Sequence, residues 1–321
     1  MKAIVQEGSG SADVLHVREV DKPVVTDGHV LVRVRAASVN ALDWHSVHGG
    51  KILEVASTFM RQADQPIRGV DVAGTVEAVG AGVTQFAAGD EVFGGAPAAF
   101  AEYALARESA LVLKPRNLSF EQAAAVGVAG RTALQGLRDH GQVKPGQRVL
   151  ISGAGGGVGT FAVQIAKALG AHVTAVTSTR NVDLIRSLGP DEVIDYTQED
   201  FKRRGDRYDV VFDVAANRSV SDLRSVLKPN GVLVLVGADK RGGLAIFTRI
   251  GGAFARSRLF GQRIVFYVAK ASQEDLILLK EMIEAGRICP AIDRTYPMSE
   301  AADAVRYLGS GQARAKVVIT M

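Results

Sequence analysis

Two patterns of apolar and polar positions divide the chain. Up to about residue 118, apolar residues alternate with polar ones, as in residues 30–35 and 72–79, which predicts half-buried β-strands. Beyond that point, short and nearly continuous apolar segments alternate with segments of helical spacing. This second pattern predicts an α/β domain whose parallel sheet is covered by helices on both faces. The remainder, which ends in residues 315–320, is expected to return to the first domain.

These patterns define three expected segments. They are a β-rich domain over residues 1–118, a doubly wound parallel-sheet domain over 119–268 and a return segment over 269–321. Ser119, followed by Glu121 and Gln122, has the spacing of a helix N-terminus. The strands of the second domain are expected at residues 148–152, 172–177, 192–195, 208–213, 231–237 and 264–268.

The overall composition is that of an ordinary globular protein. Of the 321 residues, 47% are hydrophobic and 22% are charged, close to the averages for globular domains. No apolar run is long enough to span a bilayer, and the first residues lack the basic and apolar regions of a secretory signal. The single cysteine, Cys289, excludes an internal disulfide and a cysteine-based zinc cluster. A reducing cytoplasm is therefore the expected compartment.

The excess of positive charge is small, but the acidic residues are unevenly distributed. Lys and Arg exceed Asp and Glu by 4, which is too few to indicate a nucleic-acid-binding protein. No carboxylate occurs from residue 140 to 182 or from 240 to 273. The first gap surrounds a glycine-rich turn, where acidic side chains would repel a bound polyanion. The alternative is chance clustering within a buried segment.

This glycine-rich turn, residues 153–159, lies between a predicted strand and a predicted helix. It reads Gly-Ala-Gly-Gly-Gly-Val-Gly, so Ala154, Gly156 and Gly159 take the three positions of the G-x-G-x-x-G motif. Small residues let the backbone approach a pyrophosphate closely, and the N-terminus of the following helix offers it N–H groups. The turn is interpreted as a dinucleotide site; the alternative is a purely structural turn.

The end of the next strand indicates which dinucleotide is bound. NAD-binding domains place an Asp or Glu there, which accepts hydrogen bonds from the ribose hydroxyls. This chain has Ser178, Thr179 and Arg180 instead. Two hydroxyls and a guanidinium match a 2′-phosphate, so NADPH is the predicted cofactor. The alternative is a helix N-cap formed by Ser178 or Thr179 beside a solvent-exposed arginine.

Six further short segments have a recognisable composition. They are residues 38–44 (Ser-Val-Asn-Ala-Leu-Asp-Trp), 69–74 (Gly-Val-Asp-Val-Ala-Gly), 88–94 (Ala-Gly-Asp-Glu-Val-Phe-Gly), 100–103, 130–135 and 194–197. Together with the glycine-rich turn, they resemble the medium-chain dehydrogenase/reductase superfamily, and most closely its zinc-free quinone-oxidoreductase-like branch. The resemblance covers nearly the whole chain. It implies a Rossmann cofactor domain joined to a β-rich, GroES-like catalytic domain.

The positions that bind zinc in the alcohol dehydrogenases of this superfamily hold other residues here. The resemblance places Asn40 where those enzymes have a cysteine, and Gly69-Val70-Asp71 where they have Gly-His-Glu. A catalytic zinc polarises the oxygen of an alcohol or carbonyl group. No metal site is therefore expected, and the resemblance implies hydride transfer to quinones or to alkenes conjugated with a carbonyl group.

The resemblance also implies cofactor contacts for individual residues. The pyrophosphate would contact the backbone of Gly155, Gly156, Gly157 and Val158. The adenosine 2′-phosphate would be surrounded by Ser178, Thr179, Arg180 and Tyr196. The ribose and nicotinamide would lie along Thr132, Ala215 and Gly237.

The catalytic groups are less clearly marked. Hydride addition to a quinone or enone places negative charge on a carbonyl oxygen, which a hydrogen-bond donor stabilises. The Asn40 amide is the leading candidate for this donor and Tyr103 is a second; Asp43 and His45 are candidates for proton transfer. The alternatives are structural: Asn40 bonded to loop backbone, Asp43 capping a short helix and Tyr103 packing on its sheet.

Residues 240–270 combine many basic side chains with apolar ones. They are interpreted as a lid, as an amphipathic helix that contacts a membrane, or as a solvated insertion.

Two classes of function remain: an NADPH-dependent reductase of quinones or enones, and an NADPH-binding sensor or interaction protein without turnover. An alcohol dehydrogenase is a distant third. The expected partner is a small electrophile, with no nucleic acid and no membrane, and the resemblance is compatible with a homodimer.

Overall fold

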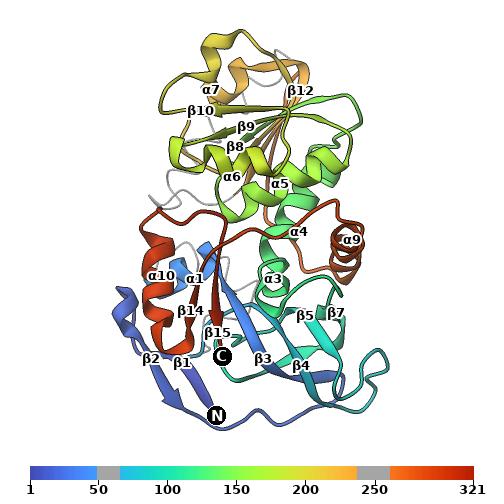
Figure 1. Ribbon diagram of the computed structural model, residues 1–321, viewed down its shortest axis with the longest axis vertical. Helices are drawn as coiled ribbons and strands as arrows, with labels where there is room; N and C mark the ends of the chain where they lie inside the picture. Colours follow the sequence, from blue (N-terminus) through green and yellow to red (C-terminus); the bar gives the residue numbers. More distant parts are fainter. Residues whose placement is uncertain (49–65, 237–260) are drawn as a thin grey trace. The chain divides into compact units, whose positions relative to one another are not determined.

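The computed structural model describes residues 1–48, 66–236 and 261–321. Contacts between residues divide the chain into two units (Figure 1). The first unit comprises Met1–Arg131, Ala271–Gly286 and Pro290–Met321, and the second comprises Thr132–Lys270 and Arg287–Cys289. The first boundary between the two units along the chain thus follows Arg131, whereas the predicted boundary followed residue 118. The reason is that helix α3 (Phe120–Ala124) packs on the strands of the first unit.

The first unit is built around a seven-stranded sheet in the order β14-β15-β3-β4-β5-β7, with β6 paired to β3. Its strands are β3 (His29–Val39), β4 (Asp71–Val79), β5 (Glu91–Gly95), β6 (Tyr103–Arg107), β7 (Leu111–Leu113), β14 (Ile292–Pro297) and β15 (Lys316–Thr320). β15 runs antiparallel to β3, which agrees with the predicted return of the C-terminal segment. A separate two-stranded sheet pairs β1 (Lys2–Gln6) with β2 (Leu15–Glu19).

Strand β3 follows the predicted alternation only in its first half. Val32 and Val34 are buried there, whereas Arg33 and Arg35 are exposed. Residues 36–39 are all buried, because α3 and α10 (Ala301–Gly309) pack on this strand. The apolar side chains of β3 therefore contribute to the core of the first unit along the whole strand.

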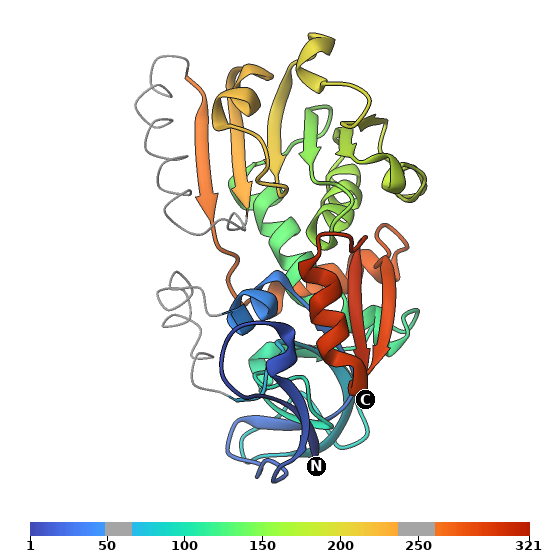
Figure 2. The same cartoon turned by 90° about the vertical axis from the view of Figure 1, so that its left-hand side faces the viewer.

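The helices of the first unit begin where local sequence signals place them. The side chain of Ser119 accepts a hydrogen bond from the Gln122 N–H, and Gln122 bonds back, which confirms the predicted start of α3. Helix α10 lies beside β14 and β15, as Figures 1 and 2 show. The other helical segments are α1 (Ala41–His48), the start of α4 (Gly127–Gln135), α9 (Gln273–Glu284), η1 (Ala12–Val14), η2 (Glu108–Ala110) and η6 (Met298–Glu300).

The second unit contains a six-stranded, wholly parallel sheet in the order β10-β9-β8-β11-β12-β13. Its strands are β8 (Arg148–Ser152), β9 (His172–Thr177), β10 (Glu192–Asp195), β11 (Tyr208–Asp213), β12 (Leu227–Val236) and β13 (Arg263–Tyr267). Four of them have the predicted bounds. β12 begins earlier than predicted, because Leu227 pairs with Tyr208 before the register shifts.

Helical segments connect the strands from β8 to β12, as the alternating pattern predicted. They are α5 (Gly157–Ala168), η4 (Thr179–Asn181), α6 (Val182–Ser187), η5 (Phe201–Arg204) and α7 (Val220–Ser225), and a π-helical turn, η3 (Gly136–His140), continues α4. Within the described residues, no helix is both long and apolar enough to cross a membrane.

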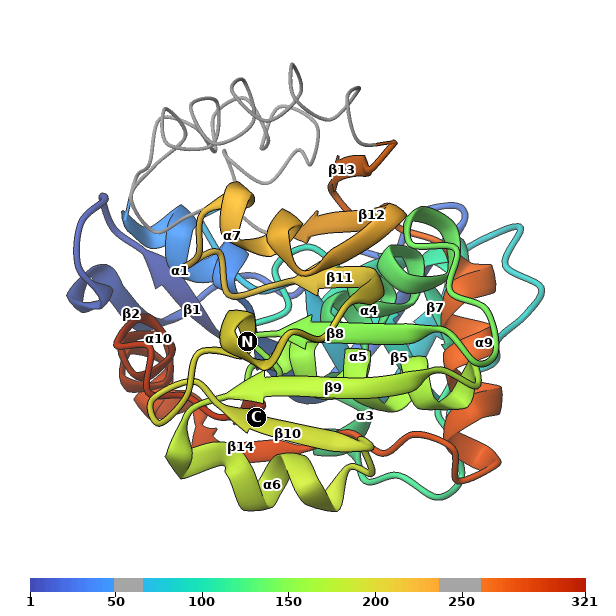
Figure 3. The same ribbon diagram turned by 90° about the horizontal axis from the view of Figure 1, so that it is seen from above.

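The strand order of the second unit reverses between β8 and β11 (Figure 3). From β8 the chain first builds outward through β9 and β10, and then crosses to β11, β12 and β13. In doubly wound sheets, ligands bind beyond the carboxyl ends of the strands at this reversal. The glycine-rich turn directly follows β8 and so lies at that position.

Candidate functional site

The glycine-rich turn has the geometry that the motif requires. Gly153 adopts a positive φ of +84° immediately after β8, and Gly156 is the N-cap of α5. A Cβ on Gly159 would lie 2.1 Å from the carbonyl oxygen of Gly153. The third motif glycine is therefore needed for the close packing of helix against strand, as the motif predicts.

The N-terminus of α5 fits a pyrophosphate. Its N-cap is a glycine, so no side chain caps the first N–H groups of the helix. Among the described residues, a Cβ on Gly156 would have only the Gly153 oxygen, at 3.7 Å, within 4 Å, so the backbone here is open to close approach. Gly155 is different, because a Cβ there would meet the Asn181 amide at 2.3 Å.

Two glycine substitutions separate the structural role of the turn from its binding role. Gly159→Ala should lower the free energy of unfolding by about 1–3 kcal/mol, because its methyl group overlaps the Gly153 carbonyl. Gly156→Ala should cost less than about 1 kcal/mol but should weaken NADPH binding, because the methyl group occupies the open side of the turn. Urea unfolding and NADPH titration of both variants test this; equal destabilisation by the two changes would contradict it.

The residues after β9 are only partly arranged as predicted. Ser178 is the N-cap of η4, but its side chain makes no capping hydrogen bond, so the alternative of a hydroxyl N-cap is not observed. The Thr179 hydroxyl lies 2.6 Å from the Asp195 carboxylate, to which it donates, and 2.7 Å from the Thr197 hydroxyl. A hydroxyl has one proton to donate, so Thr179 does not offer that proton to a phosphate. Arg180 and Tyr196 are exposed.

Asn181 is a candidate site residue that the sequence reasoning missed. Its side chain is 6% exposed and packs against Gly155. Among the described residues its Oδ1 has no hydrogen-bond partner, and its Nδ2 lies 3.4 Å from the Ser178 hydroxyl. An unpaired buried amide oxygen is costly, which fits a ligand hydroxyl at this point. An asparagine after Ser-Thr-Arg gave no signal of this burial.

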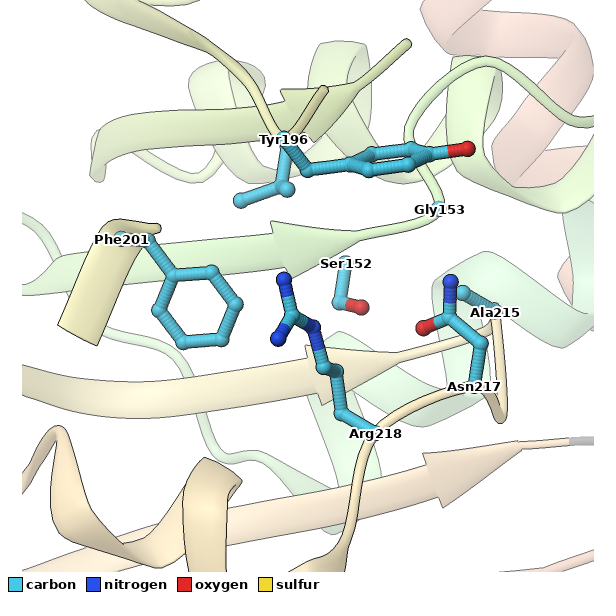
Figure 4. A pocket seen from close by; sticks show the side chains of 8 residues that line it. Ser152, Gly153, Tyr196, Phe201, Ala215, Asn217 and Arg218 are labelled. Carbon is cyan, nitrogen blue, oxygen red and sulfur yellow. The ribbon is translucent and has the colours of Figure 1, made fainter. Parts of the chain in front are cut away.

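A small pocket opens at the carboxyl ends of β8, β9, β10 and β11 (Figure 4). Two of its residues, Tyr196 and Ala215, were predicted cofactor residues. The complete lining is Ser152, Gly153, Val176, Tyr196, Phe201, Ala215, Asn217 and Arg218.

Thr132, another predicted cofactor residue, is buried, and its carbonyl accepts a hydrogen bond from the Tyr267 hydroxyl. Gly237 lies outside the described residues, as do residues 240–260 of the basic segment.

A buried polar network in the first unit contains Asn40, one of the predicted catalytic residues. Asn40 donates through Nδ2 to the Ser38 carbonyl at 3.2 Å and to Asp71 Oδ2 at 2.9 Å. Its Oδ1 accepts a hydrogen bond from Lys316 Nζ at 2.7 Å. Both hydrogen bonds that the Asn40 amide can donate are thus made within the unit. The prediction was that this amide donates to a substrate oxygen.

Asp71 is the centre of this network. Its side chain is fully buried and also accepts hydrogen bonds from the Ser38 hydroxyl and the Val128 N–H, each at 2.8 Å. Lys316 Nζ lies 3.7 Å from Asp71 Oδ2, and Lys316 is 3% exposed. The network therefore joins β15, β3 and β4 to the first turn of α4.

Within the described residues, no group of three His, Cys, Asp or Glu is arranged to hold a metal ion.

Asp43 lies beside this network and caps α1. It is 3% exposed, and its Oδ2 accepts the Asn40 N–H at 2.8 Å, which is the structural alternative considered for it. Burial raises the pKa of Asp43 to about 7; the nearby Asp71 adds to the rise, whereas the N–H groups of Asn40 and Gly69 and the Lys316 charge oppose it. Asp43 is thus a carboxyl group that exchanges a proton near neutral pH.

This raised pKa has a consequence for stability. The folded state binds a proton on Asp43 that the unfolded chain, with a pKa near 3.8, has released. The free energy of unfolding should therefore fall as the pH rises from about 4 to about 7, by up to about 1.4 kcal/mol per pH unit. Asp43→Asn should flatten this slope between pH 5 and 8, whereas Asp183→Asn, at a fully exposed carboxylate, should not. Equal slopes in wild type and Asp43→Asn, measured by urea unfolding, would refute the assignment.

Tyr103 is not brought together with Asn40 and Asp43. It pairs with Arg33 of β3, and Asn40 follows seven residues further along the chain, roughly 20 Å away at about 3.3 Å per residue. The Tyr103 ring lies under Lys22 Nζ at 3.8 Å. These contacts are those of the packing alternative considered for Tyr103, and its role as a donor to the substrate oxygen stays a prediction.

Proteins of known family are similar to this chain over nearly its whole length. A family model described as alcohol dehydrogenase GroES-like domain matches residues 26–116, and one described as zinc-binding dehydrogenase matches residues 188–319. The 2-methylene-furan-3-one reductase of Solanum lycopersicum is 34% identical over 99% of this chain and 79% of its own length. The chloroplastic NADPH-dependent alkenal/one oxidoreductase of Arabidopsis thaliana is 33% identical over the same shares. The solved quinone oxidoreductase of Coxiella burnetii has a TM-score of 0.87 and 30% identity, covering 100% of this chain and 99% of that one.

The fold and these likenesses define the class. The chain belongs to the medium-chain dehydrogenase/reductase superfamily. Within it, the chain falls in the quinone-oxidoreductase-like branch. The predicted Rossmann domain and GroES-like domain are confirmed.

Proposed function

We propose that this protein is a reductase that transfers hydride from NADPH to quinones or to α,β-unsaturated carbonyl compounds, without zinc. The observation that supports it most is the glycine-rich turn at the point where the strand order reverses. Arg180 and Tyr196 are exposed after the ends of the neighbouring strands β9 and β10. Similar proteins named as a quinone oxidoreductase and as an NADPH-dependent alkenal/one oxidoreductase support the same acceptors and cofactor.

The cofactor would be held by the second unit. The N–H groups of Gly157 and Val158, at the start of α5, would bind the pyrophosphate, and Gly155 and Gly156 would let it approach. Arg180, with Ser178 and Tyr196, would bind the 2′-phosphate. Ala215 and Thr132 would line the path to the nicotinamide, which supplies the hydride when NADPH is bound.

Asn40 and Asp43 stay the proposed catalytic residues, with roles narrowed by their contacts. For Asn40 to donate to the oxygen of the hydride acceptor, one of the two hydrogen bonds that its Nδ2 makes in this structure must be broken and replaced by a hydrogen bond to that oxygen. Asp43 is partly protonated near neutral pH, which suits the proton transfer that completes the reduction. Because Asp43 is buried, it can exchange this proton only with a group that contacts its side chain on α1.

A screen of NADPH oxidation with quinones, enones and saturated aldehydes tests the proposal. We expect turnover with the first two classes, a strong preference for NADPH over NADH, and no turnover with saturated aldehydes. Tight NADPH binding without oxidation by any quinone or enone would favour the sensor class instead. Oxidation of simple alcohols with NADP⁺ would favour an alcohol dehydrogenase.

A homodimer is part of the proposal. β13 is the last strand of its sheet among the described residues, and Phe266 on this strand and Val268 just beyond it are 40% and 60% exposed. Exposed apolar residues on a sheet edge favour pairing with a second copy. Light scattering should give twice the chain mass, and Phe266→Lys with Val268→Lys should shift it toward the monomer; a monomeric wild type would contradict the dimer.

The cytoplasm is the proposed compartment, supported by the single, exposed Cys289, which needs no oxidising environment.

A further inference from the structure

One end of the seven-stranded sheet brings a lysine into contact with a proposed catalytic residue. Strands β15, β3 and β4 are neighbours in this sheet, and β15 lies beside β3 in Figure 1. Lys316 is the first residue of β15, Asn40 directly follows β3, and Asp71 is the first residue of β4. Because β15 and β4 both run antiparallel to β3, these three residues meet at the same end of the sheet.

The two charged neighbours leave the Asn40 carboxamide a single orientation. An ammonium group only donates hydrogen bonds, and an ionised carboxylate only accepts them. The amide oxygen therefore faces Lys316, at 2.7 Å, and the amide nitrogen faces Asp71, at 2.9 Å. The reverse orientation would place the amide NH₂ group against the ammonium group and the amide oxygen against the carboxylate.

The second amide hydrogen of Asn40 is the one that a substrate oxygen can accept. It is donated to the Ser38 carbonyl at 3.2 Å, the long end of the range for such a bond. The bond to Asp71 is shorter and ends on a carboxylate, and charge-assisted bonds of this kind are the stronger ones. Exchange of the weaker bond for one to the hydride acceptor leaves the contacts with Asp71 and Lys316 in place.

The burial of Lys316 favours a role for it beyond stability. Its side chain is 3% exposed, and the transfer of an ammonium group out of water is so unfavourable that apolar residues often stabilise a fold as well as a buried ion pair does. The preceding residue, Ala315, has a φ of +54°, which is uncommon for a residue other than glycine. Strained backbone of this kind is concentrated at functional sites.

Resting on the proposed function, we propose that Lys316 is a positioning residue for the reduction, which holds the Asn40 carboxamide with one N–H group available to the oxygen of the hydride acceptor. Hydrogen bonds in a chain polarise one another, so the bond from Lys316 to Oδ1 also makes the Nδ2 hydrogens better donors. In this role Lys316 acts through Asn40 alone.

Two neutral versions of the network separate positioning from stability. Asp71→Asn with Lys316→Met and Asp71→Asn with Lys316→Gln carry no charge at either position, and methionine and glutamine have similar lengths. Only glutamine can donate a hydrogen bond to Asn40 Oδ1. The methionine version should lower kcat for a quinone or an enone by about 10- to 100-fold, as the misplacement of a catalytic group does. The glutamine version should have a kcat about fivefold above that of the methionine version, the effect of one neutral hydrogen bond. The dissociation constant of NADPH should be the same in both.

A mutant cycle tests whether Lys316 acts through Asn40. Asn40→Leu should lower kcat about 100- to 1000-fold, the effect of removing a donor to a developing oxyanion. The methionine version combined with Asn40→Leu should lower kcat no further, because residues that act as one unit are not additive. Urea unfolding of every variant identifies the conditions under which it is folded, and kcat is measured there.

Equal kcat values in the methionine and glutamine versions would make Lys316 a structural residue and overturn the proposal. Losses that multiply in the cycle would overturn it as well. Asn40→Leu requires no change at position 316, so an unchanged kcat in this variant overturns the proposal even where a version altered at 316 does not fold. The proposed reductase function fails by a separate result, namely a wild-type protein that binds NADPH but reduces none of the electrophiles.

Discussion

Replacing Lys316 by methionine is expected to lower the free energy of unfolding by about 3–5 kcal/mol, the range for breaking a buried ion pair from one side. The ammonium group is the cation within the buried network and contacts Asn40 and Asp71. Without it, the buried Asp71 carboxylate loses its ammonium partner and keeps its N–H and O–H donors and the charge of the buried Arg131. Because Lys316 begins β15, the loss also weakens the joint between the C-terminal strand and β3.

The matched control is Lys280→Met. Lys280 forms an exposed ion pair with Glu284 one helical turn away, at 2.9 Å, so this change should cost less than about 0.5 kcal/mol. Adding Asp71→Asn to Lys316→Met should recover part of the loss, because it removes the charge that has lost its ammonium partner. Urea unfolding of the four proteins measures these differences; a Lys316 variant as stable as the Lys280 variant would mean that the network does not hold the first unit together.

Arg180→Ala should weaken NADPH binding about 10- to 100-fold, since a hydrogen bond to a charged group contributes about 1.5–3 kcal/mol. NADH has no 2′-phosphate, so its affinity should change less than about twofold. The selectivity for NADPH should therefore fall by nearly the whole factor. The Thr179 contacts strengthen this expectation, because the Thr179 hydroxyl proton is given to Asp195, and the arginine is left as the principal phosphate-binding group of the predicted trio.

The control for this prediction is Arg186→Ala, which removes an exposed arginine of α6 that pairs with Asp183 at 3.6 Å. It should leave both affinities unchanged. Titration of each variant with NADPH and NADH decides the matter. Equal weakening of both cofactors by Arg180→Ala would show that Arg180 does not recognise the 2′-phosphate.

The cofactor half of the molecule was largely predictable, because its signals are local. Apolar strands, a glycine-rich turn and a following helix lie next to one another in the chain, and each has its own backbone requirement. Gly159 illustrates this, since its closeness to Gly153 follows from a motif only seven residues long. Cofactor choice was also read from adjacent residues, although the structure reassigns the Thr179 hydroxyl to Asp195.

The catalytic half was less predictable, because its contacts are long-range. Lys316 lies 276 residues from Asn40, and a lysine at the start of an apolar strand gives no sign that its ammonium group is buried. The distance between Tyr103 and Asn40 could not be predicted for the same reason, because only the register of β6 on β3 determines which residues of β3 lie beside Tyr103. Asn181 was missed because its burial depends on its packing against Gly155, 26 residues earlier in the chain.

The most direct test of the account is the fate of a deuterium label at C4 of the NADPH nicotinamide, with the quinone or enone that the protein reduces fastest. For an enone, we predict label on the β-carbon of a product that keeps its carbonyl group; for a quinone, we predict one hydroquinone per NADPH consumed. Label on a carbinol carbon would identify a carbonyl reductase and contradict the account.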